Sequence, residues 1–133
     1  MRAAVIALCI PLMGSASPPP APEAVVAKAG VIPIPARYRE YLAYECRSHG
    51  VPLWIAAALI ERESRWRPRA VGRNRDGTED YGLMQLNSAY IAEFGWRYRG
   101  GLPFDPFNAF DNLAIGVEHL ATLRRHAYSW RGA

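Results

Sequence analysis

The stretch that decides the fold is residues 52–88, which read PLWIAAALIERESRWRPRAVGRNRDGTEDYGLMQLNS. Its first part is strongly apolar and begins at Pro52, a residue that suits the first turn of a helix. Trp66 and Pro68 end this helix, because the residue before a proline is disfavoured in the α region. The pattern therefore predicts a buried helix that carries Glu63 near its last turn.

The second part of this stretch is polar and predicts a small β excursion, with Asp76 and Gly77 in the tight turn of a hairpin. Further helical patterns cover residues 36–48, a segment from Asn87 or Ser88 to Gly95, and a segment from Asp105 or Asn108 to His126. The second of these three is expected to bury Tyr90, Ile91 and Phe94. The sequence thus predicts an α+β domain that is predominantly helical, with one small β-hairpin.

The N-terminal residues predict export from the cytoplasm. Arg2 precedes an apolar run from residue 3 to residue 13, and small residues lead to a cleavage position after Ala16, so residues 1–16 resemble a secretory signal peptide. The apolar run is shorter than the roughly 20 residues that cross a bilayer, so no permanent membrane span is expected. A lipoprotein signal ending at Cys9 is the weaker alternative. The predicted location is the periplasm or the cell envelope.

The rest of the chain suits one domain, since the 133 residues are 50% hydrophobic. Residues 17–35 are rich in proline and alanine and predict an extended linker, which leaves residues 36–133 for the domain. Cys46 has no partner at metal-ligand spacing and is interpreted as a small buried hydrophobe. No metal or cofactor is implied.

The chain is basic, with a formal net charge of +4. Many of its arginines flank the end of the predicted buried helix: Arg62, Arg65, Arg67, Arg69, Arg73 and Arg75. Two interpretations stay open, a solvated basic surface and a surface that attracts the carboxylates of a polymer. No nucleic-acid-binding motif accompanies the charge, so nucleic acid is not expected as a partner.

Glu63 is the candidate for acid–base chemistry. It follows the apolar residues 54–60, and a carboxyl group at the inner end of a buried helix loses hydration. Loss of hydration favours the protonated form, which a general acid requires near neutral pH. The alternative is a surface carboxylate paired with one of the nearby arginines.

The motifs around Glu63 resemble the soluble lytic transglycosylase family, especially its small members attached to secretion and pilus systems. The matching residues are Glu63-Ser64, Pro68, Ala70, Asn74-Arg75-Asp76-Gly77 and Tyr81-Gly82-Leu83-Met84-Gln85-Leu86-Asn87-Ser88. A weaker match runs downstream, so the resemblance covers roughly residues 51–130. It implies a lysozyme-like fold and a peptidoglycan substrate, with a secretion or pilus apparatus as a further partner.

The resemblance also implies roles for single residues. Glu63 would be the catalytic acid and base, and the substrate-binding set would be Ser64, Asp80, Tyr81, Gly82, Met84, Gln85 and Asn87. Ser64 would contact substrate, Gln85 would bind sugar or hold Glu63, and Gly82 would let the backbone approach the glycan. Met84 is either a wall of the cleft or a core residue. The reaction would cut the bond from N-acetylmuramic acid to N-acetylglucosamine and leave 1,6-anhydro ends, without cofactor or metal.

A second resemblance, to animal-type lysozyme, passes through the same residues. Asp80 follows Glu63 at the spacing of the second carboxylate of that family, so a two-carboxylate hydrolase is the competing hypothesis. A retaining hydrolase needs carboxyl groups about 5 Å apart. If Glu63 works alone, Asp80 instead ties or caps the hairpin. The multiple disulfides of animal-type lysozyme are absent here.

The sequence departs from the transglycosylase pattern near its last residues. In that family a Tyr-Asn-Ala-Gly stretch follows the tryptophan that Trp130 resembles, and its tyrosine contributes to the site. The given sequence stops at Ala133, so either it is truncated or Tyr81 or Tyr128 substitutes. A non-catalytic component that binds the cell wall is the third hypothesis.

Overall fold

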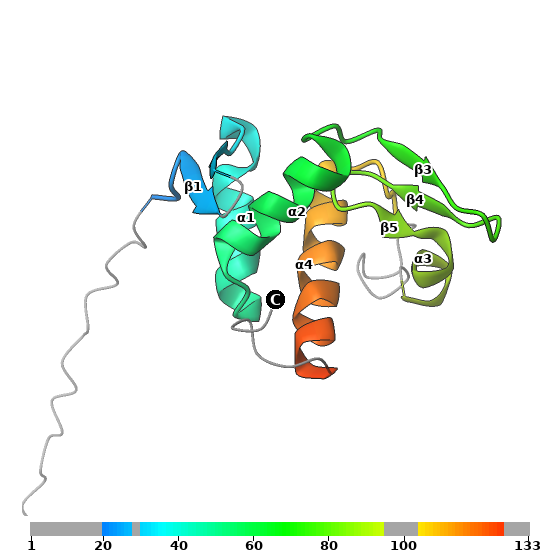
Figure 1. The fold of residues 1–133 in the computed structure, drawn as a ribbon. Coiled ribbons are helices and arrows are strands. Elements are labelled where there is room, and N and C mark those ends of the chain that lie inside the picture. The colour runs from blue at the N-terminus through cyan, green and yellow to red at the C-terminus, as the bar shows by residue number, and fades with distance from the viewer. Residues whose placement is uncertain (1–19, 28–29, 95–103, 127–133) are drawn as a thin grey trace, which may run out of the picture.

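The computed structural model describes residues 20–27, 30–94 and 104–126. Their elements are, in order, β1 (Ala24–Ala27), β2 (Gly30–Pro33), α1 (Ala36–His49), α2 (Leu53–Ser64), β3 (Val71–Arg73), β4 (Glu79–Tyr81), β5 (Leu86–Asn87), α3 (Ser88–Phe94) and α4 (Ala109–His126). The predicted α+β, predominantly helical fold is confirmed (Figure 1). The predicted signal peptide lies outside the described residues.

The core lies between α1, α2 and α4, which stand side by side in the helical part of the molecule (Figure 1). Leu42 of α1, Ile60 of α2, and Leu113 and Val117 of α4 are completely shielded from solvent. Cys46 belongs to this core, and burial raises its thiol pKa to about 12, as expected for a cysteine that acts as a hydrophobe. No helix in the described part of the chain is long and apolar enough to cross a bilayer.

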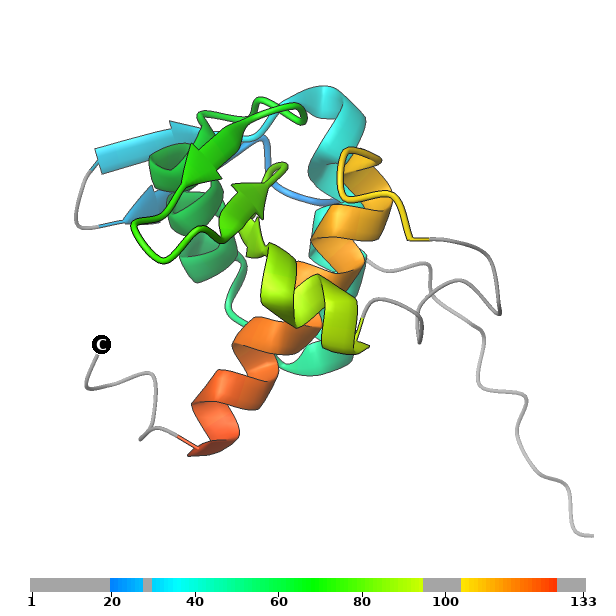
Figure 2. The ribbon, with the colours of Figure 1, turned by 90° about the vertical axis from the view of Figure 1, so that its right-hand side faces the viewer.

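A small antiparallel sheet, in the order β3-β4-β5, extends from the end of α2 (Figures 1 and 2). Gly72 pairs with Asp80, and Tyr81 pairs with Leu86. The Asn74 amide donates to the Thr78 carbonyl at 2.9 Å, which closes the turn predicted from Asp76-Gly77. The sheet leads directly into α3, so residues 71–94 form one continuous excursion from the helical core.

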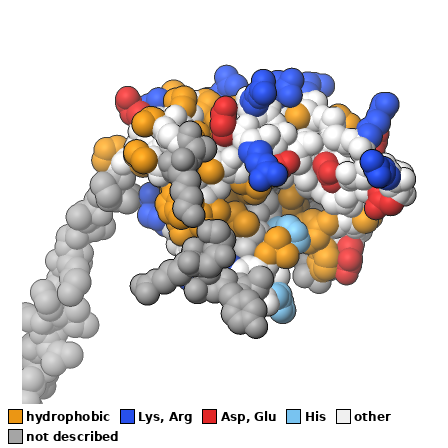
Figure 3. All heavy atoms as spheres, viewed as in Figure 1, with side chains coloured by type: hydrophobic (Ala, Val, Ile, Leu, Met, Phe, Trp, Pro, Cys, Tyr) orange, Lys and Arg blue, Asp and Glu red, His pale blue; other side chains and the backbone are white. Residues whose placement is uncertain are grey.

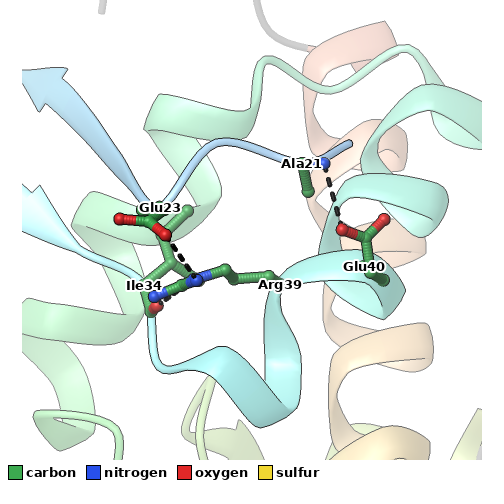
Figure 4. A network of polar contacts seen from close by, with 5 residues as sticks. All are labelled: Ala21, Glu23, Ile34, Arg39 and Glu40. Atoms are coloured by element: carbon green, nitrogen blue, oxygen red, sulfur yellow. Dashed lines mark hydrogen bonds and ion pairs between the residues drawn. The ribbon is translucent and has the colours of Figure 1, made fainter. Parts of the chain in front are cut away.

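Residues 24–34 differ from the predicted linker. β1 and β2 form an antiparallel hairpin that packs on α2, and Ile32 and Ile34 are buried in the core. Arg39 on α1 fixes this hairpin, because its Nε donates to the Ile34 carbonyl at 2.8 Å and its Nη1 reaches Glu23 at 3.4 Å (Figure 4). Burial alternates along residues 31–34, with Ile32 and Ile34 inside and Val31 and Pro33 exposed, so this segment belongs to the domain rather than to a linker.

Two helix predictions also need correction. α2 ends at Ser64, earlier than Trp66, because Arg65 and Trp66 have left-handed φ angles of 51° and 60°. In α3, Tyr90 and Phe94 are only half-buried, as is their neighbour Ile91. The expected stop of that helix at Gly95 lies outside the described residues.

The last helix begins as predicted. Asn108 caps α4 by accepting hydrogen bonds from the amides of Phe110 and Asp111, at 3.1 and 3.2 Å. A side-chain oxygen in this position satisfies amides that the first helical turn leaves without partners. α4 can therefore start at Ala109 and carry its apolar face through the core.

Candidate active site

Glu63 stands in the last turn of α2 and faces a cavity of about 510 Å³. The residues that line this cavity are Glu63, Arg67, Arg69, Ala70, Val71, Gly72 and Gln85. The side chain of Glu63 is exposed, which corrects the expectation that the helix end would exclude water from it. Among the described residues Glu63 forms no ion pair, so the alternative of a carboxylate held by a neighbouring arginine is not observed.

Gln85 also lines this cavity. Its side-chain Nε2 donates to the carbonyls of Ala70 and Gly82, at 3.2 and 2.9 Å. Its backbone has a left-handed φ of 50°, which is uncommon for a residue with a side chain. Both hydrogen bonds hold the amide beside Gly72, where a Cβ would lie 2.9 Å from the Gln85 Oε1 atom. The structure thus brings Gln85 and Glu63 to one cavity.

Asp80 pairs in the sheet with Gly72, a residue that lines this cavity. Its Oδ2 accepts a hydrogen bond from Asn74 Nδ2 and its Oδ1 accepts one from Asn87 Nδ2, each at 2.9 Å. Both carboxylate oxygens therefore take part in cross-links of the three-stranded sheet. This arrangement corresponds to the hypothesis that Asp80 ties the hairpin.

Three of the predicted substrate-binding residues are turned into the protein. The Ser64 hydroxyl is buried and donates to the Ile60 carbonyl of its own helix at 3.2 Å. Met84 is buried, its side chain packs against Gly116, and it also lines a second cavity beside Gln85. Gly82 is buried with a left-handed φ of 78°. None of the three lines the Glu63 cavity, and their contacts with substrate stay predictions.

Tyr81 and Asn87 also make contacts within the fold. The Tyr81 hydroxyl donates to Glu79 Oε2 at 2.7 Å, and this hydrogen bond raises the tyrosine pKa. Asn87 Oδ1 accepts from the Ala89 amide at 2.9 Å, so it caps α3 in the way that the sequence predicted. Neither residue lines the Glu63 cavity. Tyr128, the other candidate tyrosine, lies outside the described residues.

Asn112 is the residue that sequence reasoning did not single out for a role. Its side chain on α4 is completely buried; its Oδ1 accepts from the Met84 amide at 2.8 Å, and its Nδ2 donates to the carbonyls of Tyr81 and Pro106, at 2.8 and 3.0 Å. The space that it occupies is the space that a Cβ on Gly82 would need. The sequence feature that could have pointed to Asn112 is an amide side chain within the apolar face of the last predicted helix, next to Leu113. Asn112 therefore fixes the loop before Gln85.

A second cavity of about 160 Å³ adjoins the first across Gln85, which lines both. Leu59, one turn before Glu63 on α2, contributes to its wall. His119 of α4 also lines it, with its ring centroid 4.1 Å from that of Tyr90, and burial lowers the pKa of this histidine. The two cavities thus share Gln85, and the second has the more apolar lining.

A carboxylate at the end of a buried helix, beside a small three-stranded sheet and above a helical core, defines a lysozyme-like domain. The profile of the transglycosylase SLT domain family matches residues 40–133. The chain therefore belongs to the transglycosylase SLT domain family, within the lysozyme-like superfamily. This family acts on peptidoglycan.

Individual relatives match shorter stretches. Invasion protein IagB of Salmonella typhimurium is 50% identical over 34 residues, which are 26% of this chain and 21% of that protein. Lysozyme C of Dromaius novaehollandiae is 41% identical over 49 residues, 37% of this chain and 32% of that protein. Lysozyme C II of Oncorhynchus mykiss is 38% identical over 47 residues, which are 35% of this chain and 31% of that protein. The matched stretches thus span about a fifth to a third of these relatives.

Proposed function

We propose that this chain is a peptidoglycan lytic transglycosylase that cleaves the β-1,4 bond between N-acetylmuramic acid and N-acetylglucosamine, with Glu63 as general acid and base. The observation that carries the proposal is the position of Glu63, exposed to the larger cavity, beside Gln85 and in no ion pair with a described residue. A carboxyl group that is not tied by structural contacts is free to exchange a proton with substrate.

The reaction needs one carboxyl group in two successive states. Protonated Glu63 gives its proton to the glycosidic oxygen as the bond to the anomeric carbon breaks, and the substrate's own acetamido group stabilises the sugar cation. The resulting carboxylate then takes a proton from the 6-hydroxyl of the muramic acid ring. That hydroxyl oxygen bonds to the anomeric carbon, which gives the 1,6-anhydro end without consuming water. Gln85 lines the cavity at a position to bind the sugar.

The contacts of Asp80 favour the single-carboxylate route over a lysozyme mechanism. Its two oxygens accept hydrogen bonds from Asn74 and Asn87, which suits a residue that holds the sheet. The hydrolytic alternative, with Glu63 and Asp80 as the pair, is kept because stretches of two lysozymes match this chain. Asp80 does not line the cavity, although a Cβ on Gly72 would come 3.7 Å from its Oδ2.

The deciding experiment is mass spectrometry of the products released from purified peptidoglycan. A lytic transglycosylase leaves 1,6-anhydro ends, whereas reducing ends with added water would refute the proposal in favour of a hydrolase. Glu63→Gln should abolish product formation, because an amide cannot donate the required proton. Glu61→Gln is the matched control, since Glu61 sits on the same helix and lines a different cavity. It should stay active.

Asp80→Asn separates the two enzymatic mechanisms. We expect a drop of roughly tenfold in rate, because Asp80 gives electrostatic support through Gly72. The folded variant should also be less stable, because the new amide nitrogen would face Asn74 Nδ2, and two donors cannot form a hydrogen bond with each other. A loss as complete as that of Glu63→Gln would favour the two-carboxylate hydrolase. If the unchanged chain sediments with peptidoglycan but releases no fragments, the binding-component hypothesis replaces both.

We also propose that the chain is exported to the periplasm or cell envelope. There it would act together with a secretion or pilus apparatus. The support is the N-terminal pattern over residues 1–16 and the likeness of one stretch to an invasion protein. Fractionation of cells that carry a tagged chain tests the location. A tag recovered in the cytoplasm at full length would contradict it.

A further inference from the structure

Two arginines in the Glu63 cavity have no role in the proposed reaction. Arg67 and Arg69 both line this cavity, and both side chains are exposed. Arg67 Nε donates to the Ser64 carbonyl at 3.0 Å, a bond that engages one nitrogen of the guanidinium group. Arg69 forms no hydrogen bond or ion pair through its side chain with any residue that the structure describes. Figure 3 shows basic side chains gathered over the end of α2 and the segment that leads into β3.

The charge of this cavity is unbalanced. It contains one carboxylate, Glu63, and two guanidinium groups, and none of them forms an ion pair with another described residue. Arg73, on the neighbouring strand, behaves differently, because its Nε contacts Glu79 at 3.3 Å. Guanidinium groups bind carboxylates through charge-assisted, often bidentate hydrogen bonds. A carboxylate of the substrate could therefore pair with the two guanidinium groups of the cavity.

The wall between the two arginines and Gln85 is built of small residues. Ala70, Val71 and Gly72 follow Arg69 directly and line the cavity. Small side chains leave room for a substituent that branches from a sugar ring. The cavity thus combines space for a branch with two cationic donors beside the proposed acid.

From these observations we propose that Arg67 and Arg69 form a carboxylate subsite that selects anionic glycan strands over neutral ones. The inference rests on the proposed function, because it deepens the substrate class of the same cleft. The carboxylate comes either from the lactyl group of a peptide-free muramic acid or from a stem peptide attached to it. A neutral polymer of N-acetylglucosamine offers neither group, and it should gain nothing from the two arginines.

The test measures binding in the full chain carrying Glu63→Gln, so that no substrate is consumed. Three probes are compared at low salt: peptide-free strands, strands whose lactyl groups carry stem peptides, and chitin oligosaccharides. Arg69→Gln should weaken binding of one or both anionic probes by up to about fivefold, the upper end for one exposed charge pair, and the double change with Arg67→Gln should weaken it further. The anionic probe that responds identifies the source of the carboxylate.

Arg75→Gln is the matched control, because it removes the same charge from the exposed hairpin turn outside the cavity. It should leave all three affinities unchanged, and thermal unfolding should show that every variant is folded. Equal losses for Arg75→Gln, or equal losses on chitin, would overturn the subsite in favour of general surface charge. Unchanged binding of both anionic probes would overturn it outright. Because binding is read without turnover, failure of the subsite is distinct from failure of the proposed reaction, which product analysis reports.

Discussion

Replacement of Asn112 by leucine should be among the most damaging single changes in this domain. The side chain is completely buried and connects α4 to two loops through three hydrogen bonds. Leucine would leave the Met84 amide and the carbonyls of Tyr81 and Pro106 without partners in the interior. Each buried polar group that loses its partner costs about 1–3 kcal/mol.

We expect the free energy of unfolding to fall by about 3–5 kcal/mol in Asn112→Leu, because the losses of neighbouring groups do not add fully. That is a large part of the roughly 5–15 kcal/mol that stabilises a domain of this kind. Urea unfolding followed by circular dichroism measures it, with the slope against urea checked for two-state behaviour. A loss below about 1 kcal/mol would refute the reasoning, since it would mean that solvent reaches these groups.

Asn112→Asp tests the hydrogen bonds of this position separately from the shape of its side chain. The carboxyl group has nearly the shape of the amide and can still accept from the Met84 amide. It cannot donate to the two carbonyls when ionised, so its neutral form is favoured in the folded state. The variant should therefore be less destabilised at acidic pH than at neutral pH. A destabilisation that does not change with pH would show that the two carbonyl contacts carry little energy.

Three further changes test other parts of the structure. Gly82→Ala should lower stability by about 2–5 kcal/mol in the same urea assay, because the residue has a left-handed φ and its Cβ would overlap Asn112; an unchanged midpoint would contradict this. Burial lowers the pKa of His119, so the unfolded state binds protons first and wild-type stability should fall as pH drops below the ordinary value of 6.5. His119→Gln should flatten that dependence, and an identical pH profile would exclude His119 as its source. Ile34→Ala should cost about 2–4 kcal/mol if residues 24–34 belong to the core, and nothing if they are a linker.

The sequence predicted the parts of the fold that depend on local patterns. The apolar period of α4, its start near Asn108, and the Asp76-Gly77 turn each depend on a few neighbouring residues, and each appears in the structure. The position of Glu63 at the end of α2 was predictable for the same reason. Its exposure was not, because the cavity beside it is made by residues that come later in the chain.

The parts that the sequence did not reveal depend on contacts between distant residues. The sequence shows a serine beside Glu63 and a glycine before Gln85, but Ser64 turns back to its own helix and Gly82 makes room for Asn112. A short motif does not reveal which neighbour will fill the space beside it. The N-terminal hairpin was missed because the prolines of residues 17–35 suggested a linker, while Ile32 and Ile34 become buried only against α2 and the core.

Through the turn after α2, the position of Glu63 depends on a contact with α1. Arg65 and Trp66 both adopt left-handed backbone angles, which cost about 1–2 kcal/mol per residue. The Trp66 ring is buried and stacks on Tyr38 of α1, with ring centroids 6.2 Å apart. Burial of that ring offsets the unfavourable turn, so α1 helps to hold the carboxyl end of α2 where it is. The position of Glu63 in its cavity thus depends on an aromatic pair outside the cavity. Natural substitutions at residue 38 or 66 would shift Glu63 while every cavity residue stays the same.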